Sequence, residues 1–107
     1  MREVHELVAS QILTALGDHD FDAVESQFDD QMRRDVPKEK ISRVWSGAVA
    51  ANGELLSWKL VTRDDQRDYA QLLYELKLEN GKLEALVTFG QKGSKVAGLF
   101  IRPPANP

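Results

Sequence analysis

The sequence predicts an α+β domain in which three N-terminal helices pack on a curved, four-stranded antiparallel meander. Apolar residues recur at helical spacing in the first half of the chain, whereas residues 55–102 alternate apolar and polar residues with the period of a strand. Within that second half, Asn80-Gly81 separates two alternating runs, which is the strongest short signal of a hairpin. We therefore expect one domain over residues 1–102, with the helices first and the sheet second.

Length, composition and charge restrict the classes of partner. The chain has 107 residues, of which 42% are hydrophobic and 29% charged, as is usual for one globular domain. The net charge of −3 and the scattered basic residues argue against nucleic acid and membranes as partners, because anionic surfaces bind clustered Lys and Arg. No apolar run reaches the roughly 18 residues of a membrane span, and no signal-peptide pattern opens the chain. We expect a soluble protein, or a module of a longer exported one.

The first two helices are predicted from periodicity and capping residues. Residues 3–16 form an amphipathic helix that ends at Gly17. Asp20 is placed to cap a second helix over residues 21–28 or 21–32. The apolar stripe of the first helix is expected to consist of Val4, Leu7, Val8, Ile12, Ala15 and Leu16. The stripe of the second is expected to consist of Phe21, Val24 and Phe28.

A polar segment and a third helix follow. Residues 29–36 are expected to be irregular, because they lack an apolar period. Pro37 suits the first turn of a helix, where its missing N–H has no intrahelical role, and Asn52-Gly53 is a typical helix end. The core face of this third helix is predicted to hold Ile41, Val44, Trp45, Ala48 and Val49.

The central hairpin has a predicted register. A two-residue type I′ turn at Asn80-Gly81 pairs Glu79 with Lys82 and Lys77 with Glu84, which places two opposite-charge pairs on the outer face. The inner face of the first three strands is then free of Asp, Glu and His. That face is predicted to hold Leu56, Trp58, Leu60, Ala70, Leu72, Tyr74, Leu76, Leu78, Leu83, Ala85, Val87 and Phe89.

The sequence determines the register and facing of the first and last strands less strongly. The turn over residues 63–68 is polar, and Arg63 and Arg67 are expected to be solvated. Its loop must hold an odd number of residues, such as 64–66, to keep Trp58 on the inner face. The loop around Lys92 to Ser94 leaves two facings open for the last strand. A two-residue loop turns Val96, Gly98 and Phe100 inward, and a three-residue loop turns Ala97, Leu99 and Ile101 inward. The last strand is apolar on both faces, which indicates either burial on both sides or an interface, such as a homodimer formed through the sheet.

Two motifs carry no predicted chemistry. Asp18 to Asp22 resembles the opening of an EF-hand loop, but Ala23 replaces its required glycine and Asp29 its final Glu, so a capping turn is favoured and no metal is expected. His5 and His19 are expected to be solvated or to flank the helix, because no nucleophile or carboxylate partner stands at a recognisable spacing. The chain has no cysteine, which excludes disulfides and thiolate chemistry. No cofactor is expected.

Four aromatic residues are the candidate site residues: Trp45, Trp58, Tyr74 and Phe100. They either line an apolar pocket between helices and sheet or simply fill the core. Beyond them, Pro103 to Pro107 holds three prolines and cannot extend a sheet. It is expected to be a linker to a fused C-terminal domain or a plain chain end.

Particular segments resemble an uncharacterised bacterial domain family with the nuclear-transport-factor-two-like fold, also called SnoaL-like or cystatin-like. The segments are Gly17 to Phe21, Val24, Phe28, Pro37 to Ile41, Val44-Trp45 and Val96 to Pro103. The resemblance implies a cone-shaped domain that stands alone or ahead of a hydrolase, often in exported proteins, and serves as an accessory module. Shared fold alone does not establish function.

Two functional hypotheses follow, beside a third in which the domain is a purely structural spacer before a hydrolase. The first is a non-catalytic accessory or binding domain that associates with itself, a partner or a small apolar ligand. The second is a small enzyme, like ketosteroid isomerase or the SnoaL-like cyclases, with a pocket around Tyr74 and Trp58. The first is favoured because the predicted inner face lacks the acid–base groups that such enzymes need.

Overall fold

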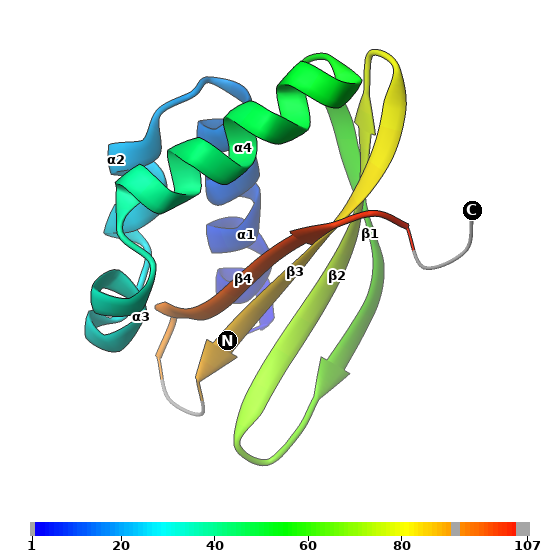
Figure 1. Ribbon diagram of the computed structural model, residues 1–107. Helices are drawn as coiled ribbons and strands as arrows, with labels where there is room; N and C mark the ends of the chain where they lie inside the picture. Colours follow the sequence, from blue (N-terminus) through cyan, green and yellow to red (C-terminus); the bar gives the residue numbers. More distant parts are fainter. Residues whose placement is uncertain (1, 91–92, 105–107) are drawn as a thin grey trace.

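The computed structural model describes residues 2–90 and 93–104, which form four helices followed by a four-stranded antiparallel sheet (Figure 1). The helices are α1 (Arg2–Gly17), α2 (Phe21–Ser26), α3 (Asp30–Asp35) and α4 (Lys38–Asn52). The strands are β1 (Leu55–Asp65), β2 (Tyr69–Leu78), β3 (Gly81–Gly90) and β4 (Val96–Arg102). They lie in the order β1-β2-β3-β4, so the predicted α+β class and meander are confirmed.

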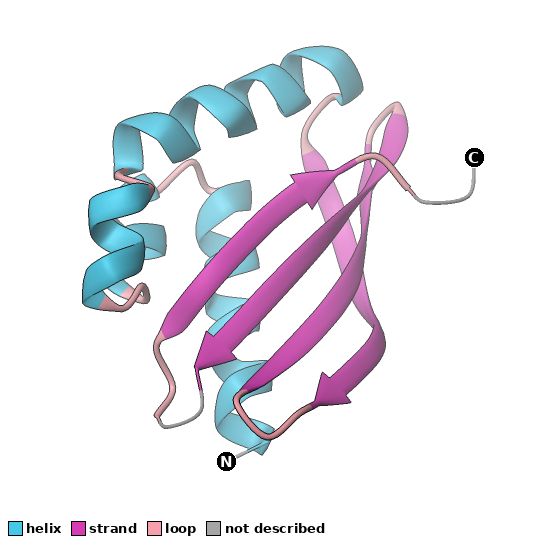
Figure 2. Cartoon of the chain, turned by 60° about the horizontal axis from the view of Figure 1, so that its bottom comes forward, coloured by secondary structure: helices cyan, strands magenta, loops and turns pink. Residues whose placement is uncertain are grey.

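The core lies between α1 and the inner face of the curved sheet, with α1 running behind that sheet (Figure 2). Its fully buried side chains include Ala9, Ile12, Leu13, Leu16, Leu72, Leu76, Val87 and Phe89. The predicted stripe of α1 was partly wrong, because Val4 and Leu7 are exposed. The buried face instead follows His5, Ala9 and Ile12, whose i, i+4, i+7 spacing is equally helical.

The end of α1 is closed by His19 rather than by a glycine. His19 has a φ of 57°, in the left-handed region. The amide of Asp20 donates to the Ala15 carbonyl at 2.8 Å, and the amide of His19 donates to the Leu16 carbonyl at 3.0 Å. This is the hydrogen-bond pattern of a Schellman motif. The helix therefore ends at Gly17 as predicted, but His19, and not Gly17, adopts the left-handed conformation that closes it.

The segment predicted to be irregular contains α3. The Asp29 carboxylate accepts a hydrogen bond from the Met32 amide at 2.7 Å and caps this helix. Between α2 and α3 the chain pairs with Val96, the first residue of β4. The Val96 amide donates to the Gln27 carbonyl, and the Val96 carbonyl accepts from the Asp29 amide. The second helix therefore ends at Ser26, earlier than predicted. Its predicted cap is confirmed, because Asp20 accepts from the Ala23 amide at 3.2 Å.

The register of the central hairpin differs by two residues from the prediction. Leu78 pairs with Gly81 and Tyr74 with Ala85, so the loop is Glu79-Asn80. A shift of two keeps every side chain on its predicted face, and the inner face of β2 and β3 is buried as expected. The predicted type I′ turn was wrong, because neither Asn80 nor Gly81 has a positive φ.

The connection between α4 and β1 explains this register. The amide of Asn80 donates to the Asn52 carbonyl at 2.7 Å, and the amide of Glu79 donates to the Glu54 carbonyl at 3.0 Å. Gly81 is required by close approach, since a Cβ atom there would collide with the Asn52 side chain. The adjoining Gly53 ends α4 at the predicted place with a φ of 84°. Turn chemistry within the hairpin is thus overridden by contacts from outside it.

The charge pairs predicted across the hairpin do not form. With the observed register, Lys77 lies opposite Lys82 and Glu75 lies opposite Glu84. The two glutamates are instead paired outward to the flanking strands. Lys59 of β1 lies 3.9 Å from Glu75, and Arg102 of β4 lies 3.2 Å from Glu84.

Two bulges shape β1. The first, at Leu56, leaves that side chain 59% exposed, so its predicted core position was wrong. The second, at Val61, turns Arg63 to the inner face opposite Leu72, where its side chain is 7% exposed. The prediction of a solvated Arg63 was therefore wrong. Trp58 shares the inner face as predicted, and the loop to β2 holds three residues, an odd number.

A bulge in β4 reconciles the two facings that the sequence left open. Val96 pairs with Phe89 and is fully buried, whereas the pairing resumes at Gly98 after one extra residue. Leu99 and Ile101 then face the core, and Phe100 is 64% exposed. Each predicted facing therefore holds on one side of the bulge. Of the preceding turn, Lys92 lies outside the described residues, as do residues 105–107 of the tail.

Among the described residues, no helix has the length and apolarity needed to cross a membrane.

Candidate functional site

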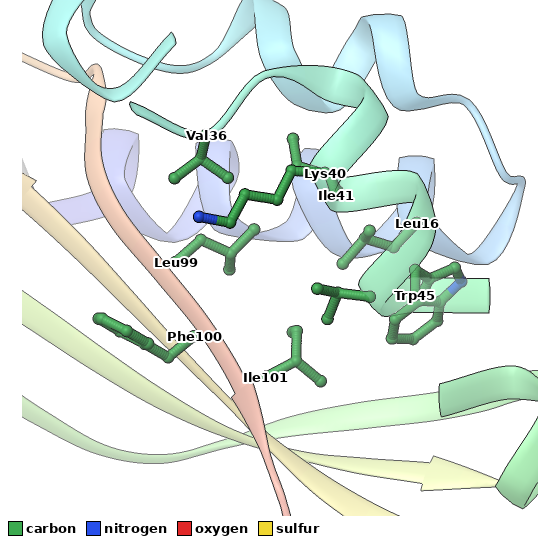
Figure 3. A pocket seen from close by; sticks show the side chains of 9 residues that line it. Leu16, Val36, Lys40, Ile41, Trp45, Leu99, Phe100 and Ile101 are labelled. Atoms are coloured by element: carbon green, nitrogen blue, oxygen red, sulfur yellow. The ribbon is translucent and has the colours of Figure 1, made fainter. Parts of the chain in front are cut away.

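A groove of about 250 Å³ lies between α4 and β4 (Figure 3). It is lined by Leu16, Val36, Lys40, Ile41, Val44, Trp45, Leu99, Phe100 and Ile101. Every lining residue except Lys40 is apolar. The groove can therefore bind apolar groups, and its lining carries one positive charge.

One wall of the groove is a single face of α4. Lys40, Ile41, Val44 and Trp45 are spaced at i, i+1, i+4 and i+5, which places them along one side of a helix. Ile41 and Trp45 are buried, whereas Val44 is 52% exposed. The apolar side chain of Val44 therefore faces solvent at the groove, and its predicted position on the core face was wrong.

Both ends of α4 are fastened, which holds this wall in place. At its start, the amide of Lys38 donates to the Glu25 carboxylate and the Lys38 ammonium donates to Asp22, both at 2.7 Å. At its end, the Asn52 carbonyl accepts from the Asn80 amide. These contacts tie α4 to α2 and to the β2–β3 turn. The space toward β4 is left partly unfilled.

The other wall is the edge strand β4. The bulge after Val96 turns Leu99 and Ile101 toward α4, and Phe100 lies on the opposite side of the strand from Trp45 (Figure 3). In the same view, the indole nitrogen of Trp45 lies on the side of the ring away from Ile101. The carbon edge of the Trp45 ring therefore faces the groove and adds apolar surface.

Two of the four aromatic candidates line this groove, on opposite sides of β4, and two do not. Trp45 and Phe100 line it. Trp58 is half-buried on β1 opposite Leu76, and Tyr74 is buried on β2. Burial raises the pKa of the Tyr74 hydroxyl above its usual value, the Glu6 carboxylate raises it further, and the Arg63 guanidinium lowers it.

Residues 9–99 of the chain match a family described as a protein of unknown function, DUF3887. The match covers most of the 107 residues. The chain belongs to this family. The search of curated proteins found no match.

The DUF3887 domain also contains a buried polar contact that the sequence did not predict. His5 is 6% exposed, so its predicted solvated position was wrong. The Arg63 Nη2 lies 2.9 Å from His5 Nδ1, and because a guanidinium only donates, Nδ1 is the acceptor. His5 is then neutral with its proton on Nε2, which donates to the Gly93 carbonyl at 3.3 Å. The imidazole also stacks on Phe89, with ring centroids 4.3 Å apart.

Both ring nitrogens of His5 are thus engaged with the protein. Arg63 is held in turn, because its Nε donates to both carboxylate oxygens of Asp65 at 2.9 Å. The i, i+4, i+7 spacing of His5 with Ala9 and Ile12 is a signal that could have placed His5 on the buried face. The inward turn of Arg63 depends on the bulge at Val61, for which the sequence carries no comparable signal.

Acidic residues of the DUF3887 domain do not assemble into a metal site within residues 2–90 and 93–104, where no cluster of three His, Asp or Glu ligands occurs. In the acidic run after α1, Asp20 caps α2 and Asp22 pairs with Lys38. His19 of the same run pairs with Glu54 at 2.8 Å.

Proposed function

We propose that this DUF3887 domain is a non-catalytic binding domain whose groove between α4 and β4 receives a small apolar ligand. The main support for this proposal is the groove itself, an apolar concavity of about 250 Å³ with one charged side chain. Ligand sites are usually concave and mostly apolar, with a few polar groups that orient the ligand. The volume lies just below the roughly 300–1,000 Å³ typical of such sites, which favours a small ligand.

The chemistry of the lining supports binding over catalysis. No lining side chain is a carboxylate, an imidazole, a hydroxyl or an amide. Both nitrogens of the buried His5 imidazole are hydrogen-bonded, one to Arg63 and the other to the Gly93 carbonyl. The enzyme alternative would centre on Tyr74 and Trp58, which do not line the groove. The helix-then-meander order and the curved sheet support a nuclear-transport-factor-two-like cone as the scaffold for this binding role.

A fluorescence titration tests the proposal. The Trp58→Phe variant retains Trp45 as its single tryptophan, and Trp45 lies in the groove. Titrating this variant with octanol is expected to give a saturable change in Trp45 emission. Val44→Glu, which places a charge at the groove, should abolish the change. The matched control Leu56→Glu alters an apolar residue of similar exposure outside the groove and should leave it intact. A linear, unsaturable response in all variants would contradict the proposal.

Self-association through the outer face of the sheet is a second candidate, favoured by a row of apolar residues there. Leu73 of β2 lies opposite Leu86 of β3, which lies opposite Phe100 of β4. Phe100 is 64% exposed and the two leucines are half-buried. A second copy could cover this row face to face and remove it from water.

Sedimentation equilibrium tests this second candidate. The wild type is expected to approach the mass of two chains as concentration rises, and Phe100→Glu should hold it at the mass of one. Leu56→Glu serves as the control, because Leu56 is exposed but lies outside the row. A wild type with the mass of one chain at every concentration would rule out the dimer.

A further inference from the structure

The single cation of the groove is available to a ligand. The Lys40 ammonium makes no hydrogen bond or ion pair within the described part of the chain, although Glu39 is its neighbour in the sequence. Its neighbour Lys38, two residues earlier, is paired with Asp22 at 2.7 Å. The Lys40 ammonium lies between Val36 and Leu99 at one end of the groove, and Trp45 lies at the other (Figure 3).

The groove is therefore amphiphilic along its length. Its cationic end matches an anionic head group, and its apolar end, between Trp45 and Ile101, matches a hydrocarbon chain. We infer that the groove binds an aliphatic monocarboxylate, with the carboxylate at Lys40 and the chain between Trp45 and Ile101. This inference rests on the proposed binding function and specifies its ligand class.

The size and charge of the groove narrow that class. The groove volume of about 250 Å³ lies below the roughly 300–1,000 Å³ that is typical of ligand sites. A short aliphatic chain therefore suits this groove better than a long-chain lipid. A single ammonium matches one negative charge. Phosphate sites commonly use Arg or a helix N-terminus in addition, and no Arg lines this groove.

Matched ligands separate the head group from the chain. Octanoate, octanol and octylamine share a chain and carry a negative, a neutral and a positive head group near neutral pH. Each is titrated into the Trp58→Phe background and into the same background with Lys40→Gln. Lys82→Gln is the control, because Lys82 is exposed on the outer face of β3 and does not line the groove.

The inference predicts a change that is specific to octanoate. Lys40→Gln should weaken octanoate binding by about two- to fivefold, the strength of a solvent-exposed ion pair, and leave octanol binding unchanged. Lys40→Glu should weaken octanoate further and strengthen octylamine. Lys82→Gln should change none of the three. Since Lys40 is exposed, these variants are expected to keep the circular dichroism spectrum of the wild type.

Two results would overturn the inference in distinguishable ways. If octanol and octanoate bind but Lys40→Gln changes both affinities equally, Lys40 does not recognise the carboxylate, and the apolar binding function stands. If no ligand of the series binds, the binding function itself fails, and the inference fails with it.

Discussion

Arg63 donates a hydrogen bond from Nη2 to Nδ1 of His5 over 2.9 Å, joining the first turns of α1 to the far end of β1. The two residues are separated by 58 positions in the sequence, and both side chains are buried. The contact fixes the tautomer of His5 and closes the end of the core beside Phe89.

Removing the guanidinium should therefore destabilise the fold. Arg63→Met keeps much of the apolar stem but leaves His5 Nδ1 without a donor, and it should lower the free energy of unfolding by about 1–3 kcal/mol. In a His5→Phe background, which keeps a ring against Phe89, the same change should cost clearly less. Urea unfolding of the four chains measures this coupling. Arg67→Met, in the exposed turn, is the control and should have little effect. Equal costs in the two backgrounds would show that the hydrogen bond does not contribute.

Tyr74 should make stability fall at high pH. Its folded-state pKa is raised above the usual 10.0, first by burial and then by Glu6. The folded chain thus retains a proton that the unfolded chain releases. The corresponding stability is fully present below the unfolded pKa and is lost as pH rises through the raised pKa.

Urea unfolding between about pH 8 and about pH 11 measures this loss. Tyr74→Phe should reduce the slope of stability against pH above about 10. Tyr69→Phe is the matched control, since Tyr69 is exposed, and should keep the slope of the wild type. A slope that is identical in Tyr74→Phe and the wild type would contradict the burial of the Tyr74 hydroxyl.

Gly81 should be required for space and not for backbone freedom. Gly81→Ala is expected to cost about 1–3 kcal/mol of stability, because its Cβ would collide with the Asn52 side chain. The loss should shrink when Asn52→Ala is added, since truncation removes the colliding atoms. Gly90→Ala is the control, because a Cβ there meets nothing within 4 Å. Thermal unfolding of these variants measures the stability losses. If the double variant loses as much stability as Gly81→Ala alone, the collision with Asn52 is not the cause.

Gly47 should be a site of stabilisation. It lies inside α4, is exposed, and has open space where a Cβ would stand. Gly47→Ala should raise the free energy of unfolding by about 0.5–1 kcal/mol through helix propensity. Gly53→Ala, just beyond the same helix, should destabilise, because its φ is positive and its Cβ would meet Glu79. Denaturant titrations of the two variants should move the midpoint in opposite directions.

Sequence periodicity placed most of the fold, because it reports which face of each element is apolar. The inner faces of β2 and β3 follow the predicted alternation, and α4 lies where Pro37 and Gly53 indicated. The pairing register was wrong by two residues, because a shift of two leaves that alternation unchanged and only distant contacts from Asn52 and Glu54 distinguish the alternatives.

Bulges account for the side-chain facings in β1 and β4 that sequence periodicity did not predict. One extra residue at Val61 turns Arg63 inward, and one at Ala97 lets Val96 and Leu99 both face the core. Alternation assumes an uninterrupted strand, so it fails at these positions. The groove was predicted only in part for the same reason. Trp45 was placed by its helical spacing, whereas the wall of β4 opposite it depends on a bulge.

Backbone amide NMR spectra test most directly whether the groove between α4 and β4 is the binding site. Spectra of the wild type would be recorded during a titration with octanoate. Binding in the groove should give saturable shifts concentrated at Ile41, Val44 and Trp45 of α4 and at Leu99 and Ile101 of β4, while the amides around Trp58 and Leu56 stay in place. Shifts concentrated on the outer face of the sheet, or no saturable shift at any residue, would contradict it.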